Sequence, residues 1–284
     1  MRIANLHERL VLLHGGRAHD VAEVSGGRFG PAVQDVYERW DEFRAWASGT
    51  SLHGGAEIDP AALGAPTPAP RQLFGIGLNY RDHAAEAGFE TPAGLPPVFT
   101  KFATAITGPN TRVALPHGDA TGRVEVDWEV ELAVVIGRVA RRVPPQDAWA
   151  HVAGLTVAQD LSERVLQMAG PAPQFSLGKS HPGFLPLGPW LVTTDELPDP
   201  DALRLSCAVN GQVVQDGTTA DLIVDVPHLI AGLSAVLPLL PGDLILTGTP
   251  AGVGMGRTPR RFLAEGDRLV SRIEHLGQMV QTFE

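Results

Sequence analysis

The chain has 284 residues, of which 44% are hydrophobic and 19% charged, a composition typical of a globular protein. The net charge of −10 argues against nucleic acid as the main partner, and no run of about 18 apolar residues marks a membrane span. The single cysteine, Cys207, excludes an internal disulfide, and the start at Met1 lacks a basic and apolar leader. We therefore expect a cytoplasmic protein.

Residues 1–70 are predicted to form a small N-terminal α+β domain. The apolar runs 11–13 and 21–24 have the character of short strands and are separated by a glycine pair. Apolar residues recur at helical spacing over 33–47. Proline and alanine dominate 60–70, which predicts a linker before the next domain.

Residues 71–284 are predicted to form a second, β-rich domain of mixed α/β class. Two helical stretches, 145–152 and 226–236, interrupt a series of short β-like runs. Strand and helix do not alternate regularly, so a Rossmann fold or a barrel of repeating βα units is excluded. The β-like runs lie at 73–76, 129–136, 190–192, 203–209, 244–246 and 269–273.

Acidic and apolar residues alternate from 124 to 132. Because strand side chains alternate between faces, the acids at Glu125, Asp127, Glu129 and Glu131 are expected to project to one side. Carboxylates this close repel one another unless they are solvated or bound to a cation. Their oxygens are the ligands that Mg²⁺, Mn²⁺ and Ca²⁺ prefer. The pattern alone fits a divalent-metal site and a solvated acidic face about equally well.

Two carboxylates rarely complete a metal site, so a third ligand is expected from another segment. Asp160 follows an apolar run, where it could open a loop beside the acidic strand or cap a helix that begins at Ser162. Arg164 and Gln167 follow Asp160 at helical spacing, which would direct a cation and an amide toward the same point.

Lysine is rare in this chain. Lys101 and Lys179 stand against twenty arginines. The compact ammonium of lysine offers donors that the planar fork of arginine does not replace, so Lys179 is predicted to be functional. Lys101 lies in an apolar, strand-like run, where it fits either a strand edge or a supporting contact near the site.

Seven motifs, taken in chain order, resemble the fumarylacetoacetate hydrolase superfamily. They are GLNYRDHAAE at 77–86, DWEVEL at 127–132, QDLS at 159–162, GKS at 178–180, VNG at 209–211, PGD at 241–243 and LTGTP at 246–250. Any one of them is weak, but the ordered set is specific. The N-terminal residues resemble the leading domain of bacterial two-domain members of the acylpyruvate hydrolase and 2-hydroxyhepta-2,4-diene-1,7-dioate isomerase type. The resemblance implies a β-roll fold, a homodimer, and one Mg²⁺ or Mn²⁺ per active site.

Matched by position, the resemblance implies a metal-ligand set. Glu129, Glu131 and Asp160 correspond to the ligands. Glu125 and Asp127 are left as supporting or surface groups. A metal bound there would act as a Lewis acid toward a 2-oxo acid and stabilise the enolate that leaves when a neighbouring C–C bond breaks.

The resemblance also implies the catalytic groups. His83 and Glu86 match a dyad that activates water, and their spacing brings them together on one helical turn. Lys179 and Gln215 match residues that face the substrate oxygens, and an ammonium can stabilise an oxyanion. The implied reaction is hydrolysis of a C–C bond in a 2,4-dioxo acid or a related β-diketone.

Arg164, Gln167 and Thr249 match residues that bind the oxo-carboxylate end of the substrate. Isomerisation, hydration and oxaloacetate-type decarboxylation on the same scaffold remain alternatives, because stabilisation of an enolate serves each of them. A metal-stabilised binding protein without turnover is the alternative from another class.

Three residues depart from the usual pattern of the family. Pro182 stands in place of an aspartate after the Gly-Lys-Ser motif, Gln159 in place of an asparagine, and Val165 in place of an aspartate. These positions are expected to surround the substrate pocket while leaving the metal ligands intact. They predict a larger or more apolar acyl side of the substrate.

Overall fold

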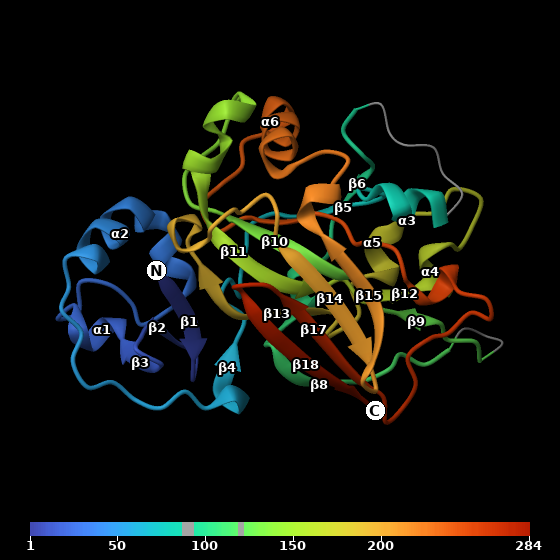
Figure 1. The fold of residues 1–284 in the computed structure, drawn as a ribbon, viewed down its shortest axis with the longest axis horizontal. Coiled ribbons are helices and arrows are strands. Elements are labelled where there is room, and N and C mark those ends of the chain that lie inside the picture. Colours follow the sequence, from blue (N-terminus) through green and yellow to red (C-terminus); the bar gives the residue numbers. More distant parts are fainter. Residues whose placement is uncertain (87–93, 119–121) are drawn as a thin grey trace.

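The computed structural model describes residues 1–86, 94–118 and 122–284. Strands dominate, and two sheets form most of the mixed α/β body, as the sequence predicts (Figure 1). The N-terminal helices α1 and α2 lie at one end of the molecule, and α3, α4 and α5 lie at the other. The site described below lies at the end that carries α3, α4 and α5.

The larger sheet has eleven strands. Its main path runs β3 (Arg17–Asp20), β2 (Arg9–His14), β1 (Arg2–Leu6), β13 (Leu185–Val192), β11 (Val152–Gln159), β10 (Val130–Ile136), β16 (Leu244–Leu246), β5 (Leu73–Ile76) and β6 (Val98–Phe99). Off this path, β4 (Leu63–Gly64) pairs with β1, and β7 (Ile106–Thr107) pairs with β13.

The second sheet has five strands and packs against the first. Its order is β15 (Gln212–Thr218), β14 (Arg204–Val209), β17 (Arg268–Ile273), β18 (Gly277–Phe283) and β8 (Asn110–Val113). A separate two-stranded ribbon pairs β9 (Val126–Asp127) with β12 (Ser162–Glu163).

The helices are short. They are α1 (Val21–Val24), α2 (Trp40–Ser48), α3 (Arg81–Glu86), α4 (Arg164–Gln167), α5 (Phe175–Gly178) and α6 (Val226–Val236). Single 3₁₀ segments lie at Gln34–Arg39, Pro60–Ala62, Ala103–Ala105, Pro145–His151, Thr194–Glu196, Thr219–Asp221 and Gly254–Gly256.

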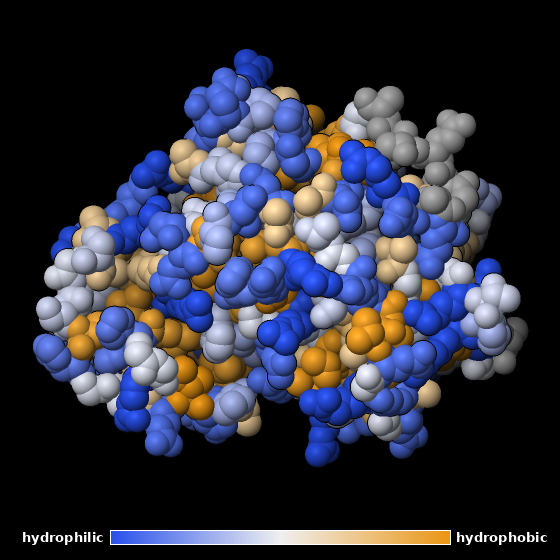
Figure 2. Space-filling model, viewed as in Figure 1, coloured by the Kyte–Doolittle hydropathy of each residue, from blue (hydrophilic) through white to orange (hydrophobic). Residues whose placement is uncertain are grey.

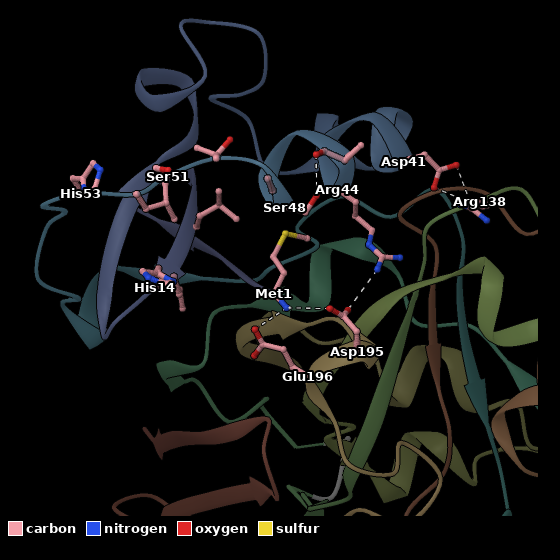
Figure 3. Close-up of a pocket in the computed structure, with 16 residues that line it drawn as sticks. Met1, His14, Asp41, Arg44, Ser48, Ser51, His53, Arg138, Asp195 and Glu196 are labelled. Carbon is pink, nitrogen blue, oxygen red and sulfur yellow. Dashed lines mark hydrogen bonds and ion pairs between the residues drawn. The ribbon is translucent and has the colours of Figure 1, made fainter.

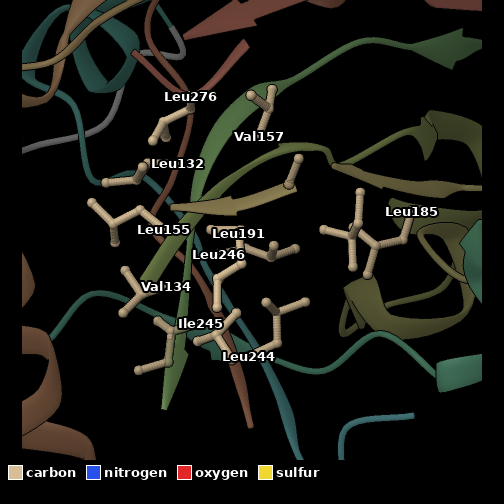
Figure 4. Close-up of a cluster of buried hydrophobic side chains, with 14 of the residues drawn as sticks. Leu132, Val134, Leu155, Val157, Leu185, Leu191, Leu244, Ile245, Leu246 and Leu276 are labelled. Atoms are coloured by element: carbon tan, nitrogen blue, oxygen red, sulfur yellow. The ribbon is translucent and has the colours of Figure 1, made fainter. Parts of the chain in front are cut away.

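The core lies between the two sheets and centres on β10. Every residue of β10 is buried, and the strand pairs antiparallel with both β11 and β16. Side chains from β10, β11, β13 and β16 gather with Leu276 in one cluster (Figure 4). A strand buried on both faces reads as a continuous apolar run, which explains the sequence from Leu132 to Ile136.

Several predicted elements are confirmed. The strands at 73–76 and 244–246 and the helix at 226–236 have the predicted bounds. The stretch 145–152 is helical over Pro145–His151, but in the tighter 3₁₀ form. The helical stretch 33–47 is also confirmed, as a 3₁₀ segment that continues into α2.

The predicted strand at 21–24 is wrong. This segment is helix α1, and the side chain of Asp20 accepts a hydrogen bond from the backbone N–H of Glu23. An aspartate at the residue before a helix satisfies a donor that the first turn leaves free, and this cap outweighs the strand propensity of valine.

The acidic strand is also not continuous. Trp128 and Glu129 separate β9 from β10, and the Asp127 carboxylate accepts from the N–H of Trp128 at the break. The two halves then pair with different partners, β12 and β11. A single strand from 124 to 132 is therefore wrong, although Glu129 and Glu131 remain neighbours.

The larger sheet runs across the predicted boundary near residue 70. Strand β1 pairs with β13, and β4, within the predicted linker 60–70, pairs with β1. The division into domains at 1–70 and 71–284 stays a prediction.

Hydrophilic residues cover most of the molecular face shown in Figure 2, and hydrophobic residues are exposed there in separate areas. None of the described helices is long and apolar enough to span a membrane.

The central position of β16 leads to a stability prediction. Ile245 is 1% exposed, so Ile245→Ala leaves a cavity and is expected to lower the free energy of unfolding by about 2–5 kcal/mol. The control Val236→Ala, at a side chain 73% exposed, is expected to change it by less than about 0.5 kcal/mol. Urea unfolding followed by circular dichroism measures both, and equal effects would contradict the placement of the core.

Candidate metal centre and substrate pocket

Glu129, Glu131 and Asp160 lie together, and we call them the carboxylate triad. Each offers a carboxylate oxygen, and these oxygens all lie within 4.8 Å of one another. All three residues are buried. The backbone joins them as well, because the N–H of Asp160 donates to the carbonyl of Glu129 at 2.9 Å. The structure therefore brings together the three residues that the sequence matched to metal ligands.

Neighbouring backbone and amide groups fix the triad. Gln159 accepts from the N–H of Glu129 at 2.9 Å and donates to Ser271 at 2.9 Å. Glu131 accepts from the N–H of Gly248 at 2.7 Å, in the glycine-rich segment after β16. Gln159, which departs from the family pattern, thus orients a triad residue from the neighbouring strand and does not line the pocket described below.

Lys179 donates to two members of the triad. Its Nζ lies 2.7 Å from Glu129 Oε2, 2.6 Å from Asp160 Oδ2 and 2.8 Å from Ser162 Oγ. Burial lowers the pKa of Lys179, but the two carboxylates outweigh burial and leave that pKa raised. These three hydrogen bonds use all three donors of the ammonium, so Lys179 binds and neutralises carboxylates of the triad.

Lys101 supplies a second buried ammonium. It lies 2.5 Å from Asp160 Oδ1 and 3.2 Å from the carbonyl oxygen of Leu161. Burial lowers the pKa of Lys101 to about 8, against the opposing effect of Asp160. Of the two readings of Lys101 that the sequence left open, the structure supports the contact near the site.

Arg164, the first residue of α4, is the third buried cation. Its Nη2 donates to Glu129 Oε1 at 2.7 Å, and its Nη1 donates to Gln167 at 2.8 Å. Asp127 accepts from Nε at 2.9 Å and from Nη2 at 2.8 Å. The helix follows a cap by Glu163, so Asp160 is not the residue that caps it.

Asp127 has a role that the sequence left undecided. Besides Arg164, its carboxylate accepts from the N–H of Gly254 at 2.6 Å and of Met255 at 3.0 Å. Asp127 thus joins Arg164 to the segment that borders the pocket. Alternation with Glu129 was the only sequence signal for it. Glu125, by contrast, is half-buried and pairs with the exposed Arg123 at 2.6 Å.

The charges in this cluster leave one carboxylate without a cation. Asp127, Glu129, Glu131 and Asp160 face Lys101, Lys179 and Arg164. Burial, Asp160 and Glu129 together raise the pKa of Glu131 well above its usual range. A divalent cation would relieve this repulsion, and three carboxylate oxygens are the donor set that a hard cation takes. The residues present therefore fit a divalent metal.

His83 and Glu86 face each other on α3. His83 Nδ1 lies 3.5 Å from Glu86 Oε2, and Glu86 also accepts from the N–H of Gly252 at 3.1 Å. Burial raises the pKa of Glu86, but the contacts with His83 and Gly252 outweigh burial and lower it. Asn79 fixes the approach to this helix by donating to the carbonyl oxygens of Val224 and Thr247.

A cavity of about 240 Å³ opens beside the triad. Seven predicted site residues line it: His83, Glu129, Glu131, Arg164, Gln167, Lys179 and Thr249. Glu86, Asp160 and Gln215 do not line it. The amide of Gln215 donates to Thr249 and Pro250 and accepts from the N–H of Val130. The predicted contact between Gln215 and substrate stays a prediction, as do the roles of the residues that line the cavity.

A larger hollow of about 750 Å³ lies at the N-terminal end of the molecule (Figure 3). Its charged side chains pair with one another, Arg44 with Asp195 at 3.5 Å and Arg138 with Asp41 at 2.7 Å. Among the described residues, the carboxylate triad is the one cluster suited to a metal. The smaller cavity is therefore the candidate active site.

A buried carboxylate triad beside an imidazole–carboxylate pair, on a β-rich fold, is the arrangement of a metal-dependent enzyme. Residues 72–284 match the family model described as fumarylacetoacetate (FAA) hydrolase C-terminal. The chain belongs to this family, which confirms the prediction made from the ordered motifs.

Three relatives illustrate the range of the family. Human "Oxaloacetate tautomerase FAHD2A, mitochondrial" is 46% identical over 216 residues, which are 76% of this chain and 67% of the relative. The solved "putative HpcE protein" of Mycobacterium smegmatis is 53% identical with a TM-score of 0.95, and the match covers 100% of this chain and 99% of that one. Maleylpyruvate hydrolase of Sphingobium sp. SYK-6, solved with manganese(II) and pyruvate, is 29% identical with a TM-score of 0.78, covering 100% and 98%.

The charge balance predicts opposite effects of Glu131→Gln with and without metal. In chelator the variant is expected to be at least as stable as the parent, because burial and the neighbouring carboxylates of Asp160 and Glu129 raise the pKa of Glu131 and so disfavour its charged form in the folded state near pH 7. Saturating Mn²⁺ at about 100 times its Kd is expected to raise the Tm of the parent by roughly 5–10 °C and that of the variant far less.

Thermal unfolding with Mn²⁺ or with chelator measures these effects. The matched control is Glu265→Gln, an exposed glutamate that is expected to keep the full metal-induced shift. If Mn²⁺ raises the Tm of Glu131→Gln as much as that of the parent, Glu131 is not a metal ligand.

Proposed function

We propose that the chain is a divalent-metal-dependent hydrolase that cleaves a C–C bond in a 2,4-dioxo acid. The observation that carries this proposal is the position of His83, which lines the same cavity as Glu129 and Glu131 and is backed by Glu86. A metal held by the triad supplies Lewis acidity toward the oxo-acid end of the substrate. The fixed cations Arg164, Lys179 and Lys101 hold the carboxylates of Glu129 and Asp160 in place.

His83 accepts the proton in the hydrolytic step. With Nδ1 facing Glu86, Nε2 is the nitrogen left to take a proton from water, and Glu86 stabilises the imidazolium that forms. The water oxygen bonds to C4, the C3–C4 bond breaks, and a proton returns to C3. The products are pyruvate and the carboxylic acid of the acyl group.

Arg164 holds the substrate end that carries the carboxylate, because one N–H of its Nη1 remains beyond its contacts with Asp127, Glu129 and Gln167. Thr249 lines the same cavity and contributes to its shape, since its hydroxyl donates to the carbonyl oxygen of Val130. Lys179 contributes its positive charge from its place on Glu129 and Asp160. A fixed charge in a water-poor site stabilises a developing oxyanion without reorganisation.

The metal is a divalent ion, and our proposal of Mg²⁺ or Mn²⁺ is supported by the manganese(II) in the related maleylpyruvate hydrolase. We also propose that the protein is a homodimer and is located in the cytoplasm. The human relative is named as mitochondrial, and that location is stated for the relative alone.

Keto–enol tautomerisation of a short oxo acid is the second candidate. The 46% identity to an oxaloacetate tautomerase favours it, and both reactions pass through an enolate of a 2-oxo acid. Only hydrolysis consumes water. Turnover in H₂¹⁸O followed by mass spectrometry is expected to place ¹⁸O in the carboxylic acid product with one pyruvate per acid. Loss of enol absorbance without C–C cleavage would contradict the proposed hydrolase activity and support the tautomerase activity.

The proposal predicts separate effects of His83 on catalysis and on metal binding. His83→Asn removes the proton acceptor and is expected to lower kcat about 10²–10⁴-fold, while the metal-induced rise in Tm remains. Steady-state kinetics and thermal unfolding give the two readouts.

His228 is the matched control. It also forms an i, i+3 pair with a carboxylate, that of Asp225 at the cap of α6, but its side chain is 61% exposed. His228→Asn is expected to retain full activity. An active His83→Asn variant would contradict the proposed role of the dyad.

A further inference from the structure

The lining of the cavity combines a charged and polar set of residues with an apolar set. Its charged and polar lining residues belong to the metal and dyad cluster described above. The remaining wall is apolar and includes Ile76, Leu78, Pro97, Phe99, Phe175 and Met255, with Met168 also lining it. A substrate whose oxo acid is held by the charged and polar residues leaves its acyl group to the apolar residues of the lining.

The described lining contains two side chains that are always cationic, Arg164 and Lys179. The ammonium of Lys179 uses its three donors on Glu129, Asp160 and Ser162. Arg164 is tied to Asp127, Glu129 and Gln167. Both cations are therefore engaged by the buried carboxylates. Lys179 lies 4.9 Å from the centre of the Phe99 ring but has no donor left for a second carboxylate, and the apolar residues of the described lining supply no other cation.

The sequence of the two segments outside the described residues contains no lysine, arginine or histidine, whether at 87–93 or at 119–121. A carboxylate buried without a partner is costly because it loses its hydration. A second acidic group on the acyl side therefore meets an unfavourable environment.

The charge of the cluster supports the same conclusion. Four carboxylates face three cations, so a bound divalent ion turns a deficit of one positive charge into an excess of one. One substrate carboxylate balances that excess. A dicarboxylate would leave the buried cluster negative again.

We infer that the site takes a monocarboxylic 2-oxo acid whose acyl group is apolar, an alkyl or aryl 2,4-dioxo acid in the proposed reaction. This inference rests on the proposed function and narrows its substrate class. It agrees with the more apolar acyl side expected from the sequence, but that expectation was based on Pro182, Gln159 and Val165. None of these three residues lines the cavity, so the apolar lining comes from other residues.

Binding of 2-oxo acids that cannot be cleaved tests the inference independently of turnover. With Mn²⁺ present, affinity is expected to rise by up to about fourfold per buried methylene from 2-oxobutanoate through 2-oxohexanoate to 2-oxooctanoate. The length-matched diacid 2-oxooctanedioate is expected to bind at least about tenfold more weakly than 2-oxooctanoate. Isothermal titration calorimetry measures these affinities on the metal-loaded protein.

Met168→Arg is the complementary gain-of-function variant. The Met168 side chain is 48% exposed and lines the cavity, so an arginine there adds a cation without burying it. We expect the preference for the monoacid over the diacid to fall about tenfold or more. Val139→Arg, at an exposed side chain outside the cavity lining, adds the same charge and is expected to leave the preference unchanged.

The outcomes separate the inference from the proposed function. A diacid that binds as tightly as the monoacid, or more tightly, overturns the apolar-substrate inference and leaves the metal-dependent reaction standing. Failure of every 2-oxo acid to bind the metal-loaded protein overturns both. Cleavage of alkyl or aryl 2,4-dioxo acids in preference to 2,4-dioxo diacids would support both.

Discussion

The compensation of charge around the buried carboxylate triad is the constraint on which the site depends. Glu129, Glu131 and Asp160 are drawn together by the pairing of β10 with β11 at the end of the apolar core. Carboxylates in such a place require paired cations or a bound metal. Lys101, Arg164 and Lys179 arrive from three further segments, so the chain after β6, helix α4 and helix α5 must all meet at the triad.

The same constraint connects the architecture to recognition of the substrate. Cations that neutralise the triad have few donors left for a ligand, and apolar residues of β5, β6 and α5 also line the cavity. In the proposed function, a divalent metal on the triad would provide the excess positive charge that an oxo acid requires. The proposed catalysis and the inferred substrate preference would then follow from one distribution of charge. The His83–Glu86 dyad lies on a separate helix, α3, which allows its chemistry to be altered without loss of the metal.

The sequence predicts the elements whose signal is local. The apolar runs at 73–76 and 244–246 are bounded by proline and glycine, and the helix at 226–236 begins after a capping Asp225. The triad was predictable because the ordered motifs of the family identify Glu129, Glu131 and Asp160 together. The roles matched to the other site residues remain predictions.

The rest depended on contacts between distant segments. Lys101 meets Asp160, 59 residues away, and Gln215 turns its amide toward Val130 and Thr249 instead of the cavity. No local pattern encodes either contact. The break in the acidic strand was missed because the side chain of Asp127 accepts a hydrogen bond from the N–H of its own neighbour, whereas alternation favours a continuous strand.

The most direct test of the metal site is an anomalous difference map from crystals grown with Mn²⁺. It is expected to show one peak per chain within coordination distance of Glu129, Glu131 and Asp160, and a metal bound elsewhere, with the triad empty, would contradict the account.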